Sequence, residues 1–350
     1  MKILLVAGKL SYSNRATYTL ELVRGLVHRE HQVCVAHHGG PLWERMEELG
    51  AEVFPVKFNY FSFRRLLGFL REFTPDLIHA TGGARALATA VRLGKSMGVP
   101  VLHTVHSWLE EDQNEELPNS LRGIIAVNES LRQHLVNERL VPKGRIRVIP
   151  YGVDGAAVVP RDFGRRNEMA AVGTFGRLDR GRRYDEFLHA ARAVRDRTDN
   201  VHFVIAGDGP DEKRLRDLAR ELKIADAVTF VQPQNDPAAI YTALDLLVIV
   251  SDWGGVGLTL LEGMAHGLPV IATGGGEVFS LLGEENVCGL VPQGDAERLA
   301  DEIVHLVNDP DLGRRLGENA RDHVLRHFPI EEQVSRSLDY YNDVLTQSAV

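Results

Sequence analysis

Residues 247–277, LVIVSDWGGVGLTLLEGMAHGLPVIATGGGE, decide the fold class of this chain. Their order predicts a strand, a glycine loop, the start of a helix, a second strand and a second glycine loop. Each loop follows a short β-branched run, so its backbone N–H groups can bind phosphate at a strand end. Glu262 lies between the loops, early in the expected helix, where a carboxylate can accept hydrogen bonds from sugar hydroxyls. The stretch has the outline of a nucleotide-sugar site.

The same alternation of apolar strands and amphipathic helices extends along the whole chain and predicts parallel α/β sheets. A Gly/Pro/Arg stretch at 152–167 has neither strand nor helix period, and we interpret it as a linker. From residue 295 onward the pattern is helical. The expected strands are 2–8, 32–38, 51–57, 76–80, 101–106, 123–128 and 145–152 before the linker, and 169–176, 201–209, 228–233, 246–251, 269–275 and 288–292 after it.

Length and composition predict a soluble globular protein with two domains. The chain has 350 residues, of which 44% are hydrophobic and 25% are charged. The N-terminal residues MKILLVAGKL lack the cleavage site of a signal peptide, and no apolar run is long enough to span a membrane. Cys34 and Cys288 lie in separate strand-like runs, which indicates reduced, structural thiols. We therefore expect a cytoplasmic protein.

Charge is divided unevenly between the two halves. Residues 1–160 hold 19 Lys and Arg against 16 Asp and Glu, whereas residues 161–350 hold 21 against 32. The net charge of −8 argues against nucleic acid as a main partner. The mildly basic first half can still meet an anionic surface.

Six ordered motifs resemble the retaining nucleotide-sugar glycosyltransferases of GT-B fold, specifically family 4. The resemblance covers nearly the whole chain and is strongest from residue 145 to 328. The motifs are VIPYGVD (148–154), GTFGRLDRGRRYDEF (173–187), VIAGDGPDEKRL (204–215), VSDWGGVGLTLLEGMAHGLPVIA (250–272), CGLVPQGDAERLA (288–300) and DPDLGRRLGENARDHV (309–324).

The resemblance implies an α/β fold of two Rossmann-like, doubly wound domains that face each other across a cleft. Strand carboxyl ends, and hence the ligands, are expected at that cleft. The implied parts are an N-terminal acceptor-binding domain (1–152), a linker (153–167), a C-terminal nucleotide-sugar-binding domain (168–328) and a C-terminal helix (329–350) that crosses back to the N-terminal domain.

In the family, an arginine after the first strand of the second domain and a lysine five residues later bind the donor diphosphate. Arg177 matches the first position, and its planar, permanently charged group suits phosphate oxygens. Arg182 stands where the lysine is expected, so the charge is kept but the donor geometry differs. The alternative is that Arg180, Arg182 and Arg183 form a solvated basic helix start.

Family members also carry two glutamates separated by seven residues. Glu262 matches the second, which usually binds the ribose hydroxyls; the alternative is a favourable interaction with a helix N-terminus. The first, which contacts the donor sugar, is replaced by Gly254. Asp252 can reach the sugar from two positions upstream, but an aspartate there is also a turn former.

The glycine-rich turns are the remaining candidates for donor binding. Three consecutive glycines cost backbone entropy, which favours a loop that closes on a ligand. A tight turn between strand and helix is an equal alternative for Gly207 and Gly209, with Asp208 between them. The candidates in the two loops of 247–277 are Gly255, Val256, Gly257, Leu258 and Thr259 in the first and Gly274, Gly275, Gly276 and Glu277 in the second.

In the first domain, His106 matches the family's histidine that faces donor and acceptor. Its imidazole can bind a sugar hydroxyl or a phosphate, although a histidine at a strand end is also commonly structural. We expect His103 to lie in the core or directly behind the site. The turn after the first strand lacks the double glycine of relatives, so Lys9, Ser11 and Ser13 are candidates for contact with acceptor or phosphate.

Residues 58–73, FNYFSFRRLLGFLREF, combine aromatic side chains with Arg64, Arg65 and Arg71. One interpretation is a helix that lies on an anionic membrane at the inner face, where relatives often find lipid-linked acceptors. The other, which we favour, is an ordinary helix packed on the sheet with its arginines outward. The acceptor is then a lipid-linked or a soluble glycan.

The resemblance implies a retaining hexosyltransferase that takes its sugar from a UDP-, GDP- or ADP-sugar and needs no further cofactor. The sequence offers no Asp-x-Asp or clustered His/Asp set suitable for a dedicated Mg²⁺ or Mn²⁺ site, so we expect a metal-independent reaction. The alternative is a non-catalytic GT-B nucleotide-sugar-binding or regulatory partner, which the replacement by Gly254 favours. A sugar-nucleotide epimerase fits the ordered motifs less well.

Overall fold

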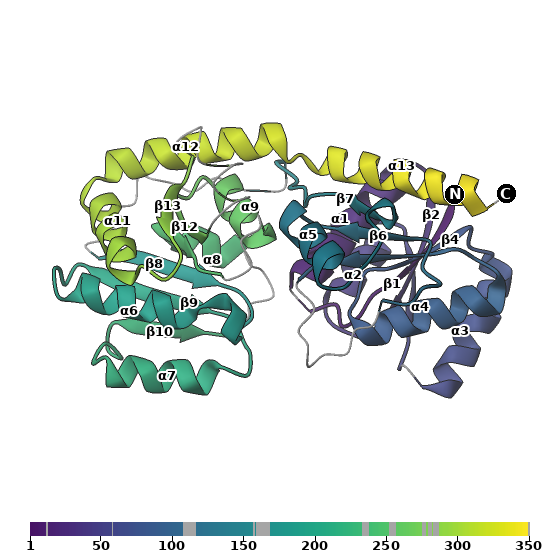
Figure 1. Ribbon diagram of the computed structural model, residues 1–350, viewed down its shortest axis with the longest axis horizontal. Coiled ribbons are helices and arrows are strands. Elements are labelled where there is room, and N and C mark those ends of the chain that lie inside the picture. Colours follow the sequence, from purple (N-terminus) through teal and green to yellow (C-terminus); the bar gives the residue numbers. More distant parts are fainter. Residues whose placement is uncertain are drawn as a thin grey trace. The chain divides into compact units, whose positions relative to one another are not determined.

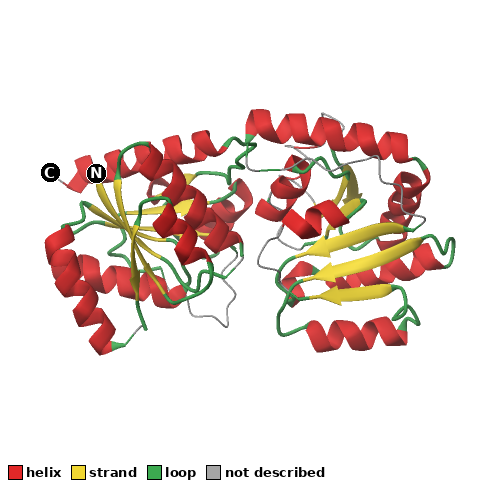
Figure 2. Ribbon diagram, turned by 180° about the vertical axis from the view of Figure 1, so that it is seen from behind, coloured by secondary structure: helices red, strands yellow, loops and turns green. Residues whose placement is uncertain are grey.

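The computed structural model describes residues 1–11, 13–57, 59–107, 117–156, 158, 169–232, 238–251, 257–274, 278, 282 and 287–348. The chain forms two compact units (Figure 1). Unit 1 combines Met1–Gly152 with Ile330–Val350, and unit 2 is Val153–Pro329. Each unit is built on its own parallel sheet with helices, so the chain has two Rossmann-like domains (Figure 2).

The sheet of unit 1 has seven parallel strands in the order β3-β2-β1-β4-β5-β6-β7. The central strands β4, β5 and β6 are buried at every position, because elements cover both faces of the sheet, whereas the edge strand β3 is partly exposed. The strands are β1 (Lys2–Val6), β2 (Gln32–His37), β3 (Glu52–Pro55), β4 (Leu77–Ala80), β5 (Val101–Val105), β6 (Gly123–Ala126) and β7 (Ile146–Val148).

The helices of unit 1 begin at side-chain caps where the sequence offers them. Ser13 caps α1, Asn59 caps α3 and Asn128 caps α5, each by accepting a backbone N–H bond. The helices are α1 (Asn14–His28), α2 (Leu42–Glu48), α3 (Tyr60–Phe73), α4 (Ala84–Met97), α5 (Glu129–Asn137) and the 3-10 helix η2 (Lys143–Arg145).

The last helix, α13 (Ile330–Ser348), belongs to unit 1 and packs against α1. A Cβ atom at Gly25 of α1 would lie 2.3 Å from Val334 Cγ2, so this glycine allows the two helices to approach closely. Gln333 Oε1 accepts a hydrogen bond of 2.6 Å from the backbone N–H of Gly152. Tyr341 is fully buried and hydrogen-bonds His79 of β4 at 2.6 Å. Residues far apart in sequence thus share one core.

The sheet of unit 2 has six parallel strands in the order β10-β9-β8-β11-β12-β13, which repeats the first six positions of unit 1. The strands are β8 (Ala170–Phe175), β9 (Val201–Ala206), β10 (Val228–Val231), β11 (Leu246–Ile249), β12 (Val270–Gly274) and β13 (Gly289–Pro292). The described helices are η3 (Arg180–Arg182), α6 (Tyr184–Arg195), α7 (Glu212–Glu221), α8 (Ala238–Ala243), α9 (Leu258–Ala265), α11 (Ala296–Asn308) and α12 (Pro310–His327).

One large apolar cluster joins the strands of unit 2 to α6, α7 and α11. Phe187 and Phe203 lie at its centre with their rings edge to face, 5.8 Å apart. On α12, Gly317 lies so close to Gly267 that an added Cβ would be 2.0 Å from the Gly267 carbonyl oxygen. The glycine at position 317 therefore lets α12 pack directly against the turn that follows α9.

Both cysteines are free and buried. Burial raises the pKa of the Cys34 thiol and of the Cys288 thiol to about 12, so neither is a thiolate at neutral pH. Their burial agrees with the structural role that the sequence predicts.

Candidate functional site

The strand order reverses at the centre of each sheet, and three of the predicted site segments follow strands that flank these points. In unit 1 the reversal falls between β1 and β4, and in unit 2 between β8 and β11. Ligands of open α/β sheets bind at the carboxyl ends of the strands beside such a reversal. Arg177 follows β8, the segment leading to α9 follows β11, and Lys9 follows β1.

The loop after β8 is fixed to the loop after β9 by backbone hydrogen bonds. Leu178 N–H donates to the Asp208 carbonyl at 2.7 Å, and Asp211 N–H donates to the Leu178 carbonyl at 3.0 Å. Arg177 lies in this fixed segment with 66% of its side chain exposed, and its Nε is 3.5 Å from Asp179 Oδ2. A rigid backbone thus presents a largely solvated guanidinium at the sheet edge.

Gly207 and Gly209 have a structural role in this pair of loops. A Cβ atom at Gly207 would lie 1.8 Å from the Gly176 carbonyl oxygen, and one at Gly209 would lie 2.2 Å from the Leu178 carbonyl oxygen. Their φ angles are +152° and +158°, a region that favours glycine. Close packing of two loops therefore explains both glycines without a ligand.

The arginines after Arg177 are not a simple solvated helix start. Arg180 is exposed, and Arg182 ends η3 as a partly buried residue. Arg183 has φ +50° and precedes α6, where its Nη2 lies 3.6 Å from Oε2 of the buried Glu186. Glu186 Oε1 also accepts a hydrogen bond of 3.0 Å from the Gly294 N–H. Arg183 is thus part of the structure of unit 2.

Glu262 is positioned by a tyrosine that the sequence analysis missed. Tyr241 Oη, from α8, donates a hydrogen bond of 2.8 Å to Glu262 Oε2. The Tyr241 ring stacks on His266 at 5.0 Å and meets Phe175 edge to face at 5.8 Å. Burial and the neighbouring Glu262 carboxylate raise the pKa of Tyr241 well above its ordinary value, so its hydroxyl remains a donor.

The helix position of Glu262 corrects one expectation. It is the fifth residue of α9 (Leu258–Ala265) and lies beyond the first turn, which contains no acidic residue. Interaction with the helix N-terminus therefore does not explain Glu262, because that effect fades after the first turn. Nothing in the sequence around Tyr241 indicates a contact with Glu262 beyond its place on α8, the helix that precedes β11.

In the described part of the two glycine loops of 247–277, little steric crowding requires glycine. Gly257 caps α9, and an added Cβ would meet nothing within 4 Å, so the fold does not require glycine there. Leu258 and Thr259 are buried in α9, and Gly274 ends β12. The other predicted positions of these loops lie outside the described residues: Asp252, Gly254, Gly255, Val256, Gly275, Gly276 and Glu277.

In unit 1, His106 directly follows β5 and is enclosed by aromatic side chains. Its Nδ1 hydrogen-bonds Tyr151 Oη at 2.9 Å, and the Tyr18 ring meets it edge to face at 4.9 Å. Burial, helped by the positive charge of Arg15, holds the pKa of His106 well below its ordinary value, although the Thr81 backbone opposes this shift. His106 is therefore a neutral imidazole at physiological pH.

The loop after β1 carries the weaker candidates of unit 1. Lys9 is exposed and Ser11 is partly exposed, so both side chains are available to a ligand. Ser13 is the N-cap of α1: its Oγ accepts a 3.4 Å hydrogen bond from Ala16 N–H. An added Cβ at Gly40 would lie 2.3 Å from the Leu10 carbonyl carbon, so this loop also depends on a close glycine contact.

A buried polar network lies beneath His106 and was not predicted. His79 Nε2 and Tyr18 Oη both hydrogen-bond Thr104 Oγ1, at 2.7 and 3.2 Å. His103 is 2% exposed, as expected of a core residue, and its Nδ1 hydrogen-bonds the Ala80 carbonyl at 2.9 Å. Buried polar groups need such partners, so this network fixes β4, β5 and α1 relative to one another.

The helix α3 combines a buried and an exposed face. Phe63, Leu66, Leu70 and Phe73 are buried, whereas Phe61 is 82% exposed. Arg64, Arg65 and Arg71 are exposed, as expected for a helix packed on a sheet, and Arg65 lies 5.1 Å from the Phe54 ring centroid. Among the helices that the structure describes, none has the length and apolar character needed to cross a membrane.

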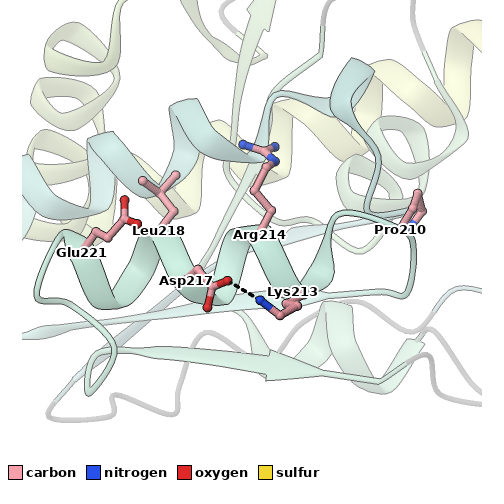
Figure 3. A pocket seen from close by; sticks show the side chains of 6 residues that line it. All are labelled: Pro210, Lys213, Arg214, Asp217, Leu218 and Glu221. Carbon is pink, nitrogen blue, oxygen red and sulfur yellow. Dashed lines mark hydrogen bonds and ion pairs between the residues drawn. The ribbon is translucent and has the colours of Figure 1, made fainter.

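Among the described residues, neither a metal-binding group nor a pocket adds to the predicted site. No three His, Cys, Asp or Glu side chains in the described ranges are grouped so that they could hold a metal ion. A shallow depression follows one side of α7, where Lys213 pairs with Asp217 at 2.9 Å (Figure 3). It contains none of the predicted site residues.

Two family models together match most of the chain. The model described as "Glycosyl transferases group 1" matches residues 160–323, and the model described as "Glycosyltransferase Family 4" matches residues 16–156. The chain belongs to the family 4 glycosyltransferases of GT-B fold.

This GT-B chain is similar to curated enzymes with different substrates. The N-acetyl-alpha-D-glucosaminyl L-malate synthase of Bacillus anthracis is 34% identical over 146 residues, which are 42% of this chain and 38% of that relative. The alpha-monoglucosyldiacylglycerol synthase of Streptococcus pneumoniae is 24% identical over 321 residues, which are 83% of this chain and 71% of that relative. The match therefore spans less than half of the first relative's length.

Solved GT-B structures share the fold. Anabaena HepE in complex with UDP-glucose superposes with a TM-score of 0.82 at 18% sequence identity, over 97% of this chain and 100% of HepE. At this identity the likeness establishes the fold of the family 4 chain and not its substrates.

Proposed function

We propose that the protein is a retaining, metal-independent glycosyltransferase that moves a sugar from a nucleoside diphosphate to a hydroxyl acceptor. The observation that carries the proposal is the placement of Arg177 and Glu262 in unit 2, one after β8 and the other on the helix after β11. These strands flank the reversal of the sheet, where a nucleotide is expected. A cation for phosphate and a carboxylate for ribose hydroxyls suit the two ends of such a donor.

In this mechanism Arg177 and Arg182 stabilise the diphosphate as it leaves. The bond from the anomeric carbon to the diphosphate oxygen breaks, and a bond from the same carbon to the acceptor oxygen forms on the same face. The acceptor proton passes to an oxygen of the leaving phosphate, so no protein nucleophile is needed. A fixed positive charge lowers the barrier because the negative charge on the diphosphate grows in the transition state.

Two classes of acceptor are compatible with the relatives. The name of one contains L-malate, a small organic acid, and the name of the other contains diacylglycerol, a lipid. The exposed Phe61 and the exposed arginines of α3 suit peripheral contact with a membrane and hence a lipid acceptor. A UDP-sugar is the donor to test first, because HepE was solved with UDP-glucose.

Substitution of Arg177 tests the proposal. Arg177→Ala should lower kcat/KM at least about 100-fold, since it removes a charge that acts on the developing diphosphate. Nucleoside diphosphate release from a panel of UDP-, GDP- and ADP-sugars measures this loss, and circular dichroism confirms the fold. Arg180→Ala, an exposed arginine three residues further on, is the matched control and should retain activity. Full activity of Arg177→Ala overturns the assignment.

The alternative is a nucleotide-sugar-binding protein without transferase activity, which Gly254 favours because the family glutamate is absent there. The same panel separates the two functions. Binding of a nucleotide by calorimetry, without diphosphate release from any donor and acceptor pair, would support the binding protein.

A further inference from the structure

The first turn of α1 places an arginine at the sheet edge beside His106. Arg15, Tyr18 and Thr19 are three and four residues apart, so they share one face of the helix. On that face the Tyr18 ring packs on His106 at 4.9 Å, and Thr19 Oγ1 donates to Thr81 Oγ1, directly after β4, at 2.8 Å. Arg15 lies one turn closer to the helix N-terminus, beyond these contacts.

The guanidinium of Arg15 has no partner in the part of the chain that the structure describes. No hydrogen bond or ion pair involves its side chain there, although Arg15 is only partly exposed. Elsewhere in unit 1, Arg147 is paired with Asp343 at 2.7 Å and Arg24 with Glu21 at 3.3 Å. An unpaired cation that has lost part of its hydration costs free energy, which a bound anion can recover.

The groups around Arg15 favour an anion. The pKa of His103, lowered to about 4 by burial and by the positive charge of Arg15, leaves this imidazole neutral, like that of His106. The Nε2 atom of His106 is buried without a hydrogen bond of normal geometry to any described residue. Arg15 thus supplies one permanent positive charge beside two neutral imidazoles at the carboxyl end of β5.

Two helix N-termini add to the attraction. The first turns of α1 and α4 contain no acidic residue, and the N-cap of α4 is Gly83, which has no side chain to occupy the free N–H groups. The segments before the two helices meet where Gly82 faces Gly8, since an added Cβ at Gly82 would lie 2.5 Å from Gly8 N. Free N–H groups at helix N-termini bind anions.

We propose that the acceptor carries an anionic group, a carboxylate or a phosphate, which Arg15 binds in unit 1. This inference rests on the proposed transferase function, and it selects an acceptor with an anionic group over an uncharged one such as diacylglycerol. Arg15 then sets acceptor specificity, because an uncharged acceptor leaves the guanidinium without a partner.

Calorimetry with L-malate and inorganic phosphate as probes tests this proposal, with and without UDP. Both probes are titrated into the unmodified protein, Arg15→Gln and Arg15→Lys. Arg45→Gln is the matched control, because Arg45 is an exposed arginine of the same unit. At least one probe should bind the unmodified protein and Arg45→Gln, and bind Arg15→Gln at least about tenfold more weakly. Arg15→Lys should bind at an intermediate level, and UDP should bind all variants equally.

The outcomes separate the two proposals. Absence of binding by both probes, or equal binding by Arg15→Gln, overturns the anionic acceptor while UDP binding leaves the transferase function intact. Absence of binding of UDP, GDP and ADP by the unmodified protein overturns the transferase function, and the anion titrations without nucleotide still decide the role of Arg15. Sugar transfer to diacylglycerol vesicles that is unaffected by Arg15→Gln also overturns the anionic acceptor.

Discussion

At the residue scale, Glu262 owes its orientation to Tyr241. A carboxylate on the surface of a helix can adopt several rotamers, but the 2.8 Å hydrogen bond from Tyr241 Oη selects one. Tyr241 is itself held between His266 and Phe175 and is 1% exposed. For the donor that we propose, the carboxylate is therefore positioned before binding, which would lower the entropic cost of binding.

Removal of the Tyr241 hydroxyl tests this positioning. Tyr241→Phe keeps the ring packing but frees the carboxylate, so we expect UDP affinity to fall about tenfold by calorimetry. Because Tyr241 acts through Glu262, the double variant Tyr241→Phe/Glu262→Gln should bind UDP no more weakly than Glu262→Gln alone. Tyr184→Phe, a change at another buried tyrosine of unit 2, controls for the loss of a hydroxyl. Additive losses in the double variant would contradict a positioning role.

Sequence patterns made Glu262 a candidate site residue but gave no sign of Tyr241 or Arg15. A carboxylate between two glycine loops belongs to a local pattern, whereas the partners of Glu262 and His106 come from other elements of the fold. Tyr241 is 21 positions from Glu262, and Tyr151 is 45 positions from His106. Such pairs depend on tertiary structure, which spacing along the chain does not encode.

At the element scale, each expected strand has a counterpart in the described structure, and the differences fall at the ends. The expected strand 201–209, for example, ends at Ala206, because Gly207 and Gly209 turn the chain. The expected strand 145–152 is reduced to Ile146–Val148, since η2 occupies its start. Apolar runs in the sequence mark the cores of strands well, whereas turn geometry decides where they end.

The pair of loops after β8 and β9 yields a stability prediction. Gly207→Ala puts a Cβ atom 1.8 Å from the Gly176 carbonyl oxygen at φ +152°, so it should lower the free energy of unfolding by about 2–4 kcal/mol. Gly257→Ala is the control: nothing lies within 4 Å of the added atom, and we expect a change below about 1 kcal/mol. Urea denaturation measures both. Equal stability of the two variants would refute the packing role of Gly207.

At the scale of the whole molecule, unit 1 contains buried histidines that stay neutral well below the ordinary pKa of histidine. Unit 1 encloses His79, whose pKa is lowered to about 3 chiefly by burial, and His103, whose pKa is lowered to about 4. In the unfolded chain these side chains titrate near their ordinary pKa of about 6.5. Below that pH the unfolded state binds more protons than the folded state, so the stability of unit 1 falls as the pH falls.

We therefore expect unit 1 to lose stability in mild acid. Between pH 7 and pH 5 each of the two histidines should reduce the free energy of unfolding by about 2 kcal/mol. Hydrogen exchange, corrected for the intrinsic rate at each pH, should show lost protection in β4 and β5 at pH 5. His79→Gln should reduce this pH dependence, whereas the exposed His28→Gln should not. Equal protection of β4 and β5 at both pH values would contradict the prediction.

The placement of α13 in unit 1 has a consequence for how the protein forms in the cell. A ribosome synthesises residues 1–152 first, but the side chains of Tyr341 and Val334 that complete their core come only after all of unit 2. Domains usually fold in the order in which they emerge. Here the contiguous second unit can finish folding while the first still exposes the surface of α1 that α13 will cover, so the nascent chain carries an incomplete domain through most of its translation.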